Sequence, residues 1–384
     1  MEWKEVRLGD IADVQTGPFG SQLHKSDYIA EGIPCIMPTN IGPHLNFIVD
    51  GIAHVSEVDA NRLSRHLTEI GDIIYARRGD IEKCAYVTTN EEKWLCGTGC
   101  LKIRCNNEVN SRFIAYLLST AECKKWITGN AVGTTMLNLS KGILSNLPLL
   151  VPSHEDQRRI ASILSSLDRK IELNNKINAD LEEMAQAIFK NWFVDFEPFK
   201  DGKFVDSELG MIPEGWKVGT LEDLITIKYG KDHKKLEDGT FPVYGSGGLM
   251  RFVNSWLYNG ESVLIPRKGT LDNIMYVCEK FWTVDTMFFS VPKMDYVMKY
   301  VYNYIKRFDF SKMNEGTSVP SNTAARLNKM QILIPTHEVL EMYDETLCPI
   351  YNKRKMNDKE SRTLSLLRDT LLPRLMSGEL EVPE

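Results

Sequence analysis

The sequence repeats itself at about half its length, and this repeat limits the chain to a fold that is built twice. A tryptophan, a lysine, a leucine, an aspartate and a glycine recur at matching places in two opening segments, and a pair of basic residues recurs further on. Three matched segments in the same order are poorly explained by chance. The aligned segments are 2–17 with 215–230, 71–80 with 260–270 after a one-residue gap, and 133–155 with 316–338.

Length and composition agree with two folded domains. The chain has 384 residues, more than twice the ~150 of a typical domain, and its hydrophobic content of 43% is that of a globular protein. No run of about 18 apolar residues occurs, and the charged start lacks the apolar stretch of a signal peptide, so we expect no membrane partner and a cytoplasmic location. The net charge of −6 means that any surface for nucleic acid must be local.

Each repeat opens with a body that mixes strands and helices. Short β-branched or aromatic runs between turn residues predict strands, such as residues 72–76 and 262–266. Apolar residues at helical spacing predict helices in residues 111–127 and 298–308. The bodies are therefore expected to be mixed α and β.

Each body is followed by a long amphipathic segment. Apolar residues spaced alternately four and three apart run from Ile160 to Trp192 and again from Tyr343 to Leu375, where Pro373 is expected to close the helix. Such long helices need a partner, and an antiparallel pair would bring Asn174 and Asn178 near Asn357 and Ser361. The alternative is that these asparagines are merely solvated. The fold class is therefore α+β: two mixed α/β domains, each followed by a long helix, with the helices pairing as an antiparallel coiled coil.

Catalytic and metal-binding motifs are missing from the sequence. His154-Glu155 and His337-Glu338 lack the second histidine of a zinc protease motif, and neither a P-loop nor a Rossmann glycine pattern occurs; GSGGL at 245–249 has the wrong spacing. The histidine–glutamate pairs fit helix starts capped by Ser153 or Thr336. The eight cysteines, including the group Cys96, Cys100 and Cys105, are interpreted as reduced thiols. We predict neither a catalytic nor a metal site.

Basic and polar loop residues are the better candidates for function, because they could contact phosphates or base edges. The recurrence of Arg-Arg-Gly and Arg-Lys-Gly after the same strand favours those pairs. Any single charge is better explained as a solvated surface group, and the alternative for the hydroxyls is a role in turns and caps. The candidates are Lys25, Arg77, Arg78, Thr134, Thr135, Asn138 and Lys141 in the first repeat, and Lys231, Lys234, Lys235, Arg267, Lys268, Thr317, Ser318 and Arg326 in the second.

A cluster of aromatic residues follows the first long helix. Trp192, Phe193, Phe196 and Phe199 exceed what a seam between two helices can bury, so we predict that they dock a partner protein. The alternative is that they pack against the base of the second body.

Several phrases together resemble the DNA-specificity subunit of type I restriction-modification systems, and the resemblance covers essentially the whole chain. They include LGDIADVQTG near the start, the segment from Gly133 to Lys176, AIFKNWFVDFEPF at 187–199, LGMIPEGWKVGTLEDL at 209–224 and LLPRLMSGELEV at 371–382. One departure concerns Gly316 to Pro320, where a proline follows the Gly-Thr-Ser loop.

The resemblance implies a non-catalytic protein that binds a bipartite, asymmetric DNA target. Modification subunits would bring S-adenosylmethionine and methylate adenine N6, and restriction subunits would use ATP and Mg²⁺, so no cofactor is expected in this chain. A coiled-coil scaffold without DNA binding, or a subunit of a related phage-defence system, stays an alternative. The implied regions are a target-recognition domain at 1–152, a central spacer and docking helix at 153–194, a linker at 195–214, a second target-recognition domain at 215–335 and a C-terminal helix at 336–384.

Overall fold

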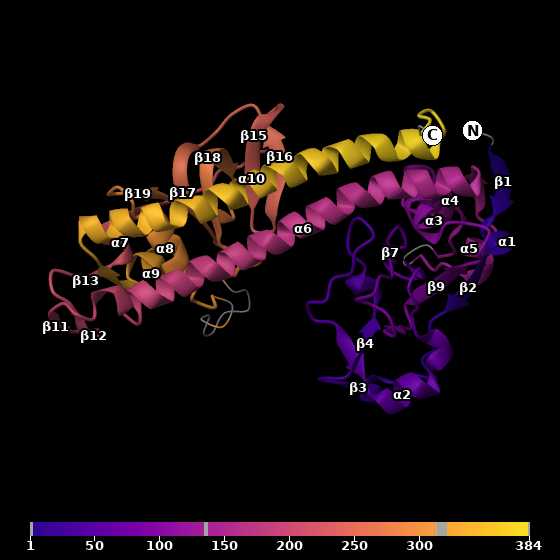
Figure 1. Cartoon of the computed structure of the whole chain (residues 1–384), viewed down its shortest axis with the longest axis horizontal. Helices are drawn as coiled ribbons and strands as arrows, with labels where there is room; N and C mark the ends of the chain where they lie inside the picture. Colours follow the sequence, from indigo (N-terminus) through magenta and orange to yellow (C-terminus); the bar gives the residue numbers. More distant parts are fainter. Residues whose placement is uncertain (1–2, 134–136, 311, 313–320, 383–384) are drawn as a thin grey trace. The chain divides into compact units, whose positions relative to one another are not determined.

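A computed structural model describes residues 3–133, 137–310, 312 and 321–382 of the chain, and it divides into two compact units (Figure 1). Unit 1 comprises Met1–Asn174 and Lys359–Glu384, and unit 2 comprises Asn175–Asp358. Each unit contains one body together with half of each long helix. The division therefore follows the packing of the chain and cuts through both helices.

Unit 1 contains two four-stranded sheets. The first sheet is antiparallel throughout, and its strands in spatial order are β2 (Ala12–Thr16), β9 (Cys100–Cys105), β6 (Ile73–Ala76) and β7 (Cys84–Tyr86). The second contains one parallel pair, β4 with β8, and its order is β3 (Tyr28–Ile29), β5 (Ala53–Val55), β4 (Ile33–Ile36) and β8 (Leu95–Cys96). The smaller elements are η1 (Lys25–Asp27), η2 (Pro38–Asn40), η3 (Ser64–His66), α1 (Leu8–Ile11), α2 (Glu57–Arg62) and α5 (Lys141–Ser145).

Helix α3 (Ser111–Leu118) links the first sheet of unit 1 to the long helices. The side chain of Asn110 caps it by accepting a hydrogen bond from the Phe113 N–H at 2.9 Å, a contact that contributes about 1 kcal/mol. Its last six residues are all buried, and the Tyr116 hydroxyl donates to Asp168 on the first long helix. Helix α4 (Ala121–Asn130) follows directly. The apolar core of unit 1 therefore runs from the sheet through α3 to the helices.

Unit 2 is built around one six-stranded sheet. Its strands in spatial order are β14 (Ile225–Tyr229), β19 (Met287–Pro292), β17 (Tyr258–Pro266), β18 (Met275–Thr283), β15 (Asp238–Gly245) and β16 (Gly248–Val253). Helix α8 (Met298–Ile305) contacts β17 and carries Tyr300, which is 1% exposed. The smaller helices are α7 (Leu221–Leu224) and α9 (Ala324–Asn328).

The two units share one backbone frame, as the repeat predicts. β1 (Lys4–Arg7) pairs with β10 (Pro148–Val151) in unit 1, and β13 (Lys217–Thr220) pairs with β20 (Gln331–Ile334) in unit 2, in the same antiparallel register. The turn after each first strand is closed alike, by an Asp10 carboxylate that accepts from the Arg7 N–H at 3.1 Å and an Asp223 carboxylate that accepts from the Thr220 N–H at 2.7 Å. The Thr220 hydrogen bonds lower the pKa of Asp223, because they stabilise its charged form.

Both long helices form where the heptads predict them. They are α6 (His154–Phe193) and α10 (His337–Met376), 40 residues each. The Ser153 hydroxyl caps α6 by accepting from the Asp156 N–H at 3.2 Å, which confirms the predicted helix start. Pro373 was expected to close the second long helix. Helix α10 instead ends at Met376, so Pro373 lies within its last turn.

Within each unit the halves of the two helices run antiparallel. In unit 1 Asn174 donates to Glu360 at 2.8 Å and to Ser361 at 3.3 Å. In unit 2 Asn178 donates to Asp358 at 2.7 Å and accepts from Asn357 at 2.9 Å. Asn174 is 0% exposed and Asn357 is 1% exposed, while Asn178 and Ser361 are half-buried and hydrogen-bonded, so the polar layer pairs as predicted and its centre is not solvated. A buried polar layer of this kind fixes the register of paired helices.

The segment at 195–214, which the sequence analysis treated as a linker, has regular structure. It contains η4 (Glu197–Phe199) and a hairpin of β11 (Phe204–Ser207) and β12 (Gly210–Pro213). Phe204 contacts Phe196 with ring centroids 5.9 Å apart, and Ile212 is 2% exposed in the core of unit 2. This segment is therefore part of the folded unit 2.

Candidate nucleic-acid interface

The Arg77–Arg78 pair of unit 1 lies in a loop that three backbone segments hold in place. The loop leaves the end of β6, and the Arg77 N–H donates to the Gly99 carbonyl at 2.8 Å, while the Leu139 N–H donates to the Arg77 carbonyl at 2.9 Å. The Arg77 side chain is half-buried and its Nε donates to Asn138 Oδ1 at 3.3 Å, whereas Arg78 is exposed. Burial, and secondly the charge of Arg78, lower the pKa of Arg77. We call residues 77–80 the first basic loop.

Unit 2 presents its Arg267–Lys268 pair in the same way. The Arg267 N–H donates to the Thr286 carbonyl at 2.8 Å, and the Asn322 N–H donates to the Arg267 carbonyl at 3.0 Å. Arg267 is half-buried and Lys268 is exposed, as Arg77 and Arg78 are in unit 1. We call residues 267–270 the second basic loop. The repeat therefore reproduces the backbone contacts of the loop as well as its charge.

Each basic loop contains a glycine with a backbone conformation that other residues rarely adopt. Gly79 has φ +77° and Gly269 has φ +87°. A glycine is needed at both positions because L-residues with a Cβ are strained there. In Arg-Arg-Gly and Arg-Lys-Gly the glycine therefore forms the turn, and the two cations supply the charge.

Near each basic loop, the end of one strand passes very close to the backbone of another segment. A Cβ added at Gly17, at the end of β2, would lie 1.9 Å from the Gly97 carbonyl oxygen, and one at Gly230, at the end of β14, would lie 2.0 Å from that of Val284. The two repeated glycines therefore allow a backbone crossing that positions the segments beside both basic loops.

The remaining candidates of unit 1 are less uniform. Lys141 forms an ion pair of 3.2 Å with Asp13, and both side chains are more than half exposed. Lys25 belongs to η1 in the region of the second sheet, apart from the first basic loop in the chain. Thr134 and Thr135 lie outside the described residues.

In unit 2 the three lysines form a loop beside the sheet. Lys231, Lys234 and Lys235 are exposed between β14 and β15. The loop is tied down by the Trp282 indole N–H, which donates to the Lys231 carbonyl at 2.9 Å, and by Arg251 of β16, which donates to the His233 carbonyl at 3.1 Å. Arg326 lies half-buried on α9. Thr317 and Ser318 lie outside the described residues.

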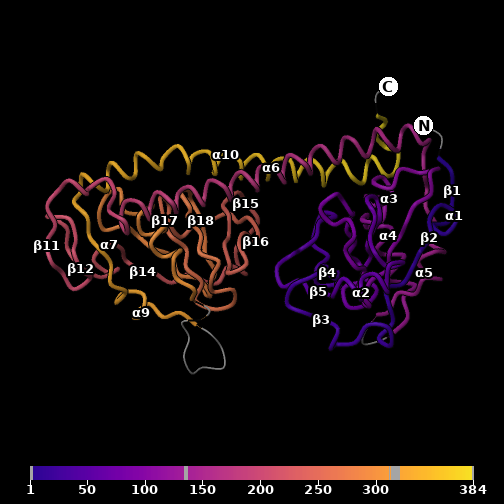
Figure 2. Tube along the Cα trace, turned by 60° about the horizontal axis from the view of Figure 1, so that its bottom comes forward, coloured from indigo at the N-terminus to yellow at the C-terminus, as the bar shows by residue number. Residues whose placement is uncertain are grey.

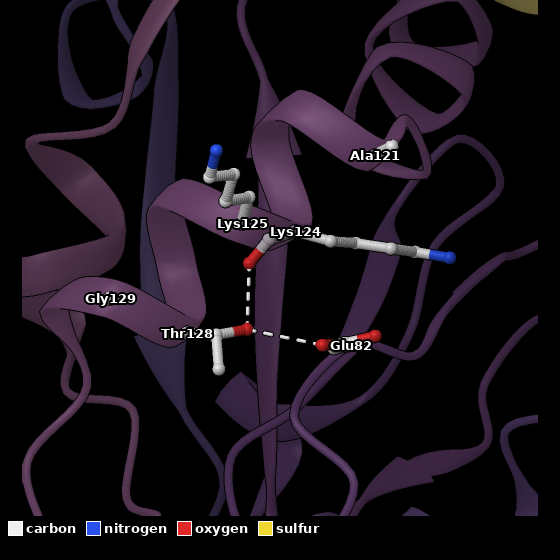
Figure 3. Close-up of a pocket in the computed structure, with 6 residues that line it drawn as sticks. All are labelled: Glu82, Ala121, Lys124, Lys125, Thr128 and Gly129. Atoms are coloured by element: carbon white, nitrogen blue, oxygen red, sulfur yellow. Dashed lines mark hydrogen bonds between the residues drawn. The ribbon is translucent and has the colours of Figure 1, made fainter.

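Two features near the loops were missed by the sequence analysis. Lys124 and Lys125 of α4 line an open hollow of about 490 Å³ with Glu82, which follows the first basic loop, and Thr128 bridges Glu82 at 3.2 Å and the Lys124 carbonyl at 2.7 Å (Figure 3). The adjacent lysines on a helix could have been noticed as a phosphate-binding signal.

The second missed feature is an aromatic residue beside the second basic loop. Tyr229 is 54% exposed, and the Arg267 guanidinium lies 5.5 Å from the centre of its ring. The signal available in the sequence was a tyrosine at the end of a strand, directly before Gly230 and Lys231.

The aromatic cluster after α6 lies in the core of unit 2. Phe193 is 5% exposed, with its ring centroid 4.6 Å from that of Tyr300. Phe196 and Phe199 are half-buried against Trp216, and Trp192 is half-buried against Phe199 and Tyr343. These rings therefore find partners within the chain beyond the helix seam, on α8, on α10 and at Trp216. The assignment to partner docking stays a prediction.

The clustered cysteines are buried apolar groups. Cys96 and Cys100 are 0% exposed, and burial raises the pKa of the Cys96 thiol to about 12, so it stays protonated at neutral pH. Among the described residues, no three histidine, cysteine or acidic side chains are grouped to hold a metal ion. None of the described helices is long and apolar enough to span a membrane.

A twofold repeated α+β fold, with one basic loop in each unit and paired long helices, defines the architecture of the chain. The sequence model of one family, described as the Type I restriction modification DNA specificity domain, matches residues 1–183 and 213–345. The chain therefore belongs to this family. Specificity subunits are non-catalytic, so this chain is not itself an enzyme.

Individual relatives agree with this assignment. The chain is 27% identical to the MjaIX specificity subunit of Methanocaldococcus jannaschii, over all of this chain and 94% of the relative. It is 23% identical to the HindI specificity subunit of Haemophilus influenzae, over 99% and 100% of the two chains. The crystal structure of an S subunit from M. genitalium superposes with a TM-score of 0.61 at 19% identity, over 98% and 96% of the two chains, and supports the fold.

Proposed function

We propose that the chain recognises a bipartite, asymmetric DNA sequence, in which unit 1 binds one half-site and unit 2 the other. The observation that carries this proposal is the recurrence of the basic loop in one backbone frame, held by equivalent hydrogen bonds in both units. The side chains around the two loops differ, with Asn138 beside Arg77 and Tyr229 beside Arg267. Different surroundings favour two different half-sites.

Within each basic loop the two cations have separate roles. Arg77 and Arg267 are half-buried and held by neighbours, so they set the loop geometry and contact the DNA backbone. Arg78 and Lys268 are exposed at the tips, where arginine can form two hydrogen bonds with guanine and lysine can reach a base or a phosphate. Asn138 and the lysines of unit 2 add polar contacts.

The paired helices act as the spacer between half-sites and as the docking surface for other subunits. Modification subunits supply S-adenosylmethionine and methylate adenine N6, and restriction subunits supply ATP and Mg²⁺ chemistry, while this chain binds no cofactor. The relatives' names as parts of type I restriction enzymes support this division. The net charge of −6 is compatible with it when the partners share the contacts to DNA.

Substitution of the two exposed cations tests the proposal. Arg78→Ala and Lys268→Ala are assembled with the modification subunits, and binding is measured on variants of each half-site and over a salt series. A base contact should cost about 1–3 kcal/mol at one position of one half-site, whereas a phosphate contact should weaken binding to all sequences and lower the salt slope by about 1.

Lys203→Ala is the matched control, because this exposed lysine precedes β11, away from the basic loop in the chain. A loop variant that loses a base contact should change specificity only at the half-site of its own unit. Unchanged affinity, specificity and salt dependence in both variants would contradict the proposal and return these cations to ordinary surface charges.

A further inference from the structure

The hairpin between β15 and β16 ends in a glycine-rich turn that no role described so far explains. Gly245 pairs with Gly248, so Ser246 and Gly247 form the turn, and Gly248 has φ +107°. A side chain on Gly247 would meet no atom within 4 Å. The turn is therefore open to solvent and leaves room for a close approach to its backbone.

This turn touches the second basic loop. A Cβ added at Gly269 would lie 2.5 Å from Ser246 Oγ, and Asn273 Nδ2 donates to the Ser246 carbonyl at 2.9 Å. Ser246 is thus fixed beside the loop that carries Arg267 and Lys268. The hairpin turn and the basic loop form one continuous surface.

Gly245, against which Met250 packs, lies near the segment that borders the lysine loop. A Cβ added at Gly245 would lie 2.6 Å from Met250 Sδ and 3.6 Å from Val284 Cγ2. The Val284 carbonyl is the group that faces Gly230, next to Lys231. Arg251, the next residue along β16, holds the lysine loop through the His233 carbonyl at 3.1 Å. The hairpin therefore lies between two groups of cations.

The hairpin exposes apolar side chains between the two groups of cations. Leu249 is 40% exposed, Met250 is 55% exposed and Phe252 is 39% exposed, all on β16 at the edge of the sheet. Apolar groups on an exposed edge strand are a liability unless something covers them. The five flanking cations favour a polyanion as the covering molecule: Lys231, Lys234, Lys235, Arg267 and Lys268.

We propose that the tip of the β15–β16 hairpin enters the major groove of the second half-site, and that Met250 contacts the 5-methyl group of a thymine there. The inference rests on the proposed function. A two-stranded ribbon fits the major groove, and the thymine methyl is the apolar feature of that groove. Lys268 and the lysine loop reach the phosphates on either side, and the Ser246 hydroxyl faces a base edge.

Unit 1 has a different element at the same place in the frame. The parallel pairing of Cys35 with Leu95 corresponds to that of Val243 with Trp282, so η2 (Pro38–Asn40) corresponds to the hairpin turn. There Ile41 is 0% exposed, and Pro38 lies against Gly99, with a Cβ at Gly99 only 2.7 Å from its ring. The residues directly after η2 are the buried Ile41 and Gly42, so this place has no counterpart of Met250, and the exposed Ile48 and Val49 come later in the chain. The methyl contact is therefore assigned to the second half-site.

Thymine-to-uracil substitution tests the contact, because uracil lacks only the methyl group. The half-sites are first defined from the methylated motif, and duplexes then carry uracil at each thymine in turn. The wild-type complex with modification subunits should lose about threefold to tenfold in affinity at one thymine of the second half-site. Met250→Ala should show a similar loss on thymine DNA and no further loss with uracil.

Met211→Ala is the matched control, since Met211 is 56% exposed on the β11–β12 hairpin, at the other end of unit 2 (Figure 2). It should respond to uracil as the wild type does. Leu249→Ala is a second variant of the tip, and a similar loss of uracil sensitivity there would support the same placement.

The two levels of failure are distinguishable. A wild-type complex without sequence-specific, salt-dependent binding would contradict the proposed function. A complex that binds normally, in which Met250→Ala keeps the uracil response of Met211→Ala, would overturn the hairpin proposal, as would a second half-site in which no thymine responds. Self-association of the free chain that Met250→Ala abolishes, with DNA binding unchanged, would assign the patch to a second copy and also overturn it.

Discussion

In unit 1 the long helices meet the body through an apolar core that encloses the Arg368–Asp168 ion pair, whereas in unit 2 a cluster of aromatic rings lies beside the buried Lys299–Asp344 ion pair. Arg368 of α10 is 3% exposed, pairs with Asp168 at 2.8 Å and lies 3.3 Å from His44. In unit 2 the rings of Phe193, Tyr300 and Tyr343 contact one another at centroid distances from 4.6 to 6.5 Å.

One pair of equivalent positions shows how such a difference arises. In unit 1 the Tyr116 hydroxyl on α3 donates to Asp168 on α6. The equivalent residues of unit 2 are Asn303 on α8 and Tyr351 on α10, and here the Tyr351 hydroxyl donates to Asn303 Oδ1 at 3.3 Å. The hydrogen bond is kept while the tyrosine moves to the other helix. Both partners must change together, because a buried polar group without a partner is destabilising.

In this repeat, one set of residues determines the shared backbone and another set determines the side-chain packing on it. Repeated glycines and turn aspartates maintain the backbone, while the side chains packed on it have diverged in matched groups. A body can therefore change its exposed loops without changing how its backbone is built. This separation suits a protein whose two halves are proposed to recognise different DNA sequences.

The largest effect is expected from the aromatic core of unit 2. Phe193→Ala removes a ring that is 5% exposed and contacts Tyr300, Tyr343 and Trp216, so unit 2 should lose about 3–5 kcal/mol of unfolding free energy. Hydrogen exchange read by mass spectrometry on peptides from each unit measures this. Met184→Ala, at a side chain 52% exposed on the same helix, is the control. Equal losses in the two variants would mean that the rings do not anchor α6.

Arg368→Met should destabilise unit 1 by about 3 kcal/mol, because the substitution keeps most of the volume but leaves the Asp168 carboxylate without its buried cation. The loss stays at the lower end of the usual range, since Tyr116 still donates to Asp168. The same exchange measurement should show the loss in unit 1 peptides. Arg374→Met breaks an ion pair with Glu379 whose side chains are 44% and 60% exposed, and should cost less than about 1 kcal/mol. A comparable effect of both variants would mean that the buried Arg368–Asp168 pair does not hold α10 to unit 1.

Local and periodic features of this fold could be predicted from sequence. The helices at 154–193 and 337–376 follow from apolar spacing, and the buried layer at Asn174 and Asn357 follows from their phase. The basic pairs were found because they recur after equivalent strands. In each case the signal lies within a few turns of helix or in a comparison of the repeats.

Contacts between distant segments could not be predicted in this way. The parallel pairing of Cys35 with Leu95 leaves no periodic signature, and the burial of Phe193 depends on Tyr300 and Tyr343, which reach it from two other helices. GSGGL lacks the spacing of a nucleotide motif, and its contact with Gly269 depends on the sheet, which brings the two turns together. The chemistry of the side chains could be predicted from the sequence, but which distant residues lie next to one another could not.

The smallest effect separates the units by pH. His66 in unit 1 is 2% exposed, and burial, followed by the charges of Arg65 and Lys102, lowers its pKa from 6.5 to about 4. Because the folded state disfavours the protonated ring, the stability that neutral His66 contributes is present above pH 6.5 and is lost as the pH falls from 6.5 towards 4. Between pH 6.5 and 5 the loss is about 2 kcal/mol. No other described histidine is as buried, so the stability of unit 2 should not depend on a histidine in this pH range.

His66→Gln keeps an acceptor for the Arg65 hydrogen bond of 2.9 Å but does not titrate. Exchange in unit 1 peptides, corrected for intrinsic rates, should therefore weaken by about 2 kcal/mol more in the wild type than in His66→Gln over this range. Parallel pH profiles of the two proteins would show that His66 is protonated at no cost in the folded state.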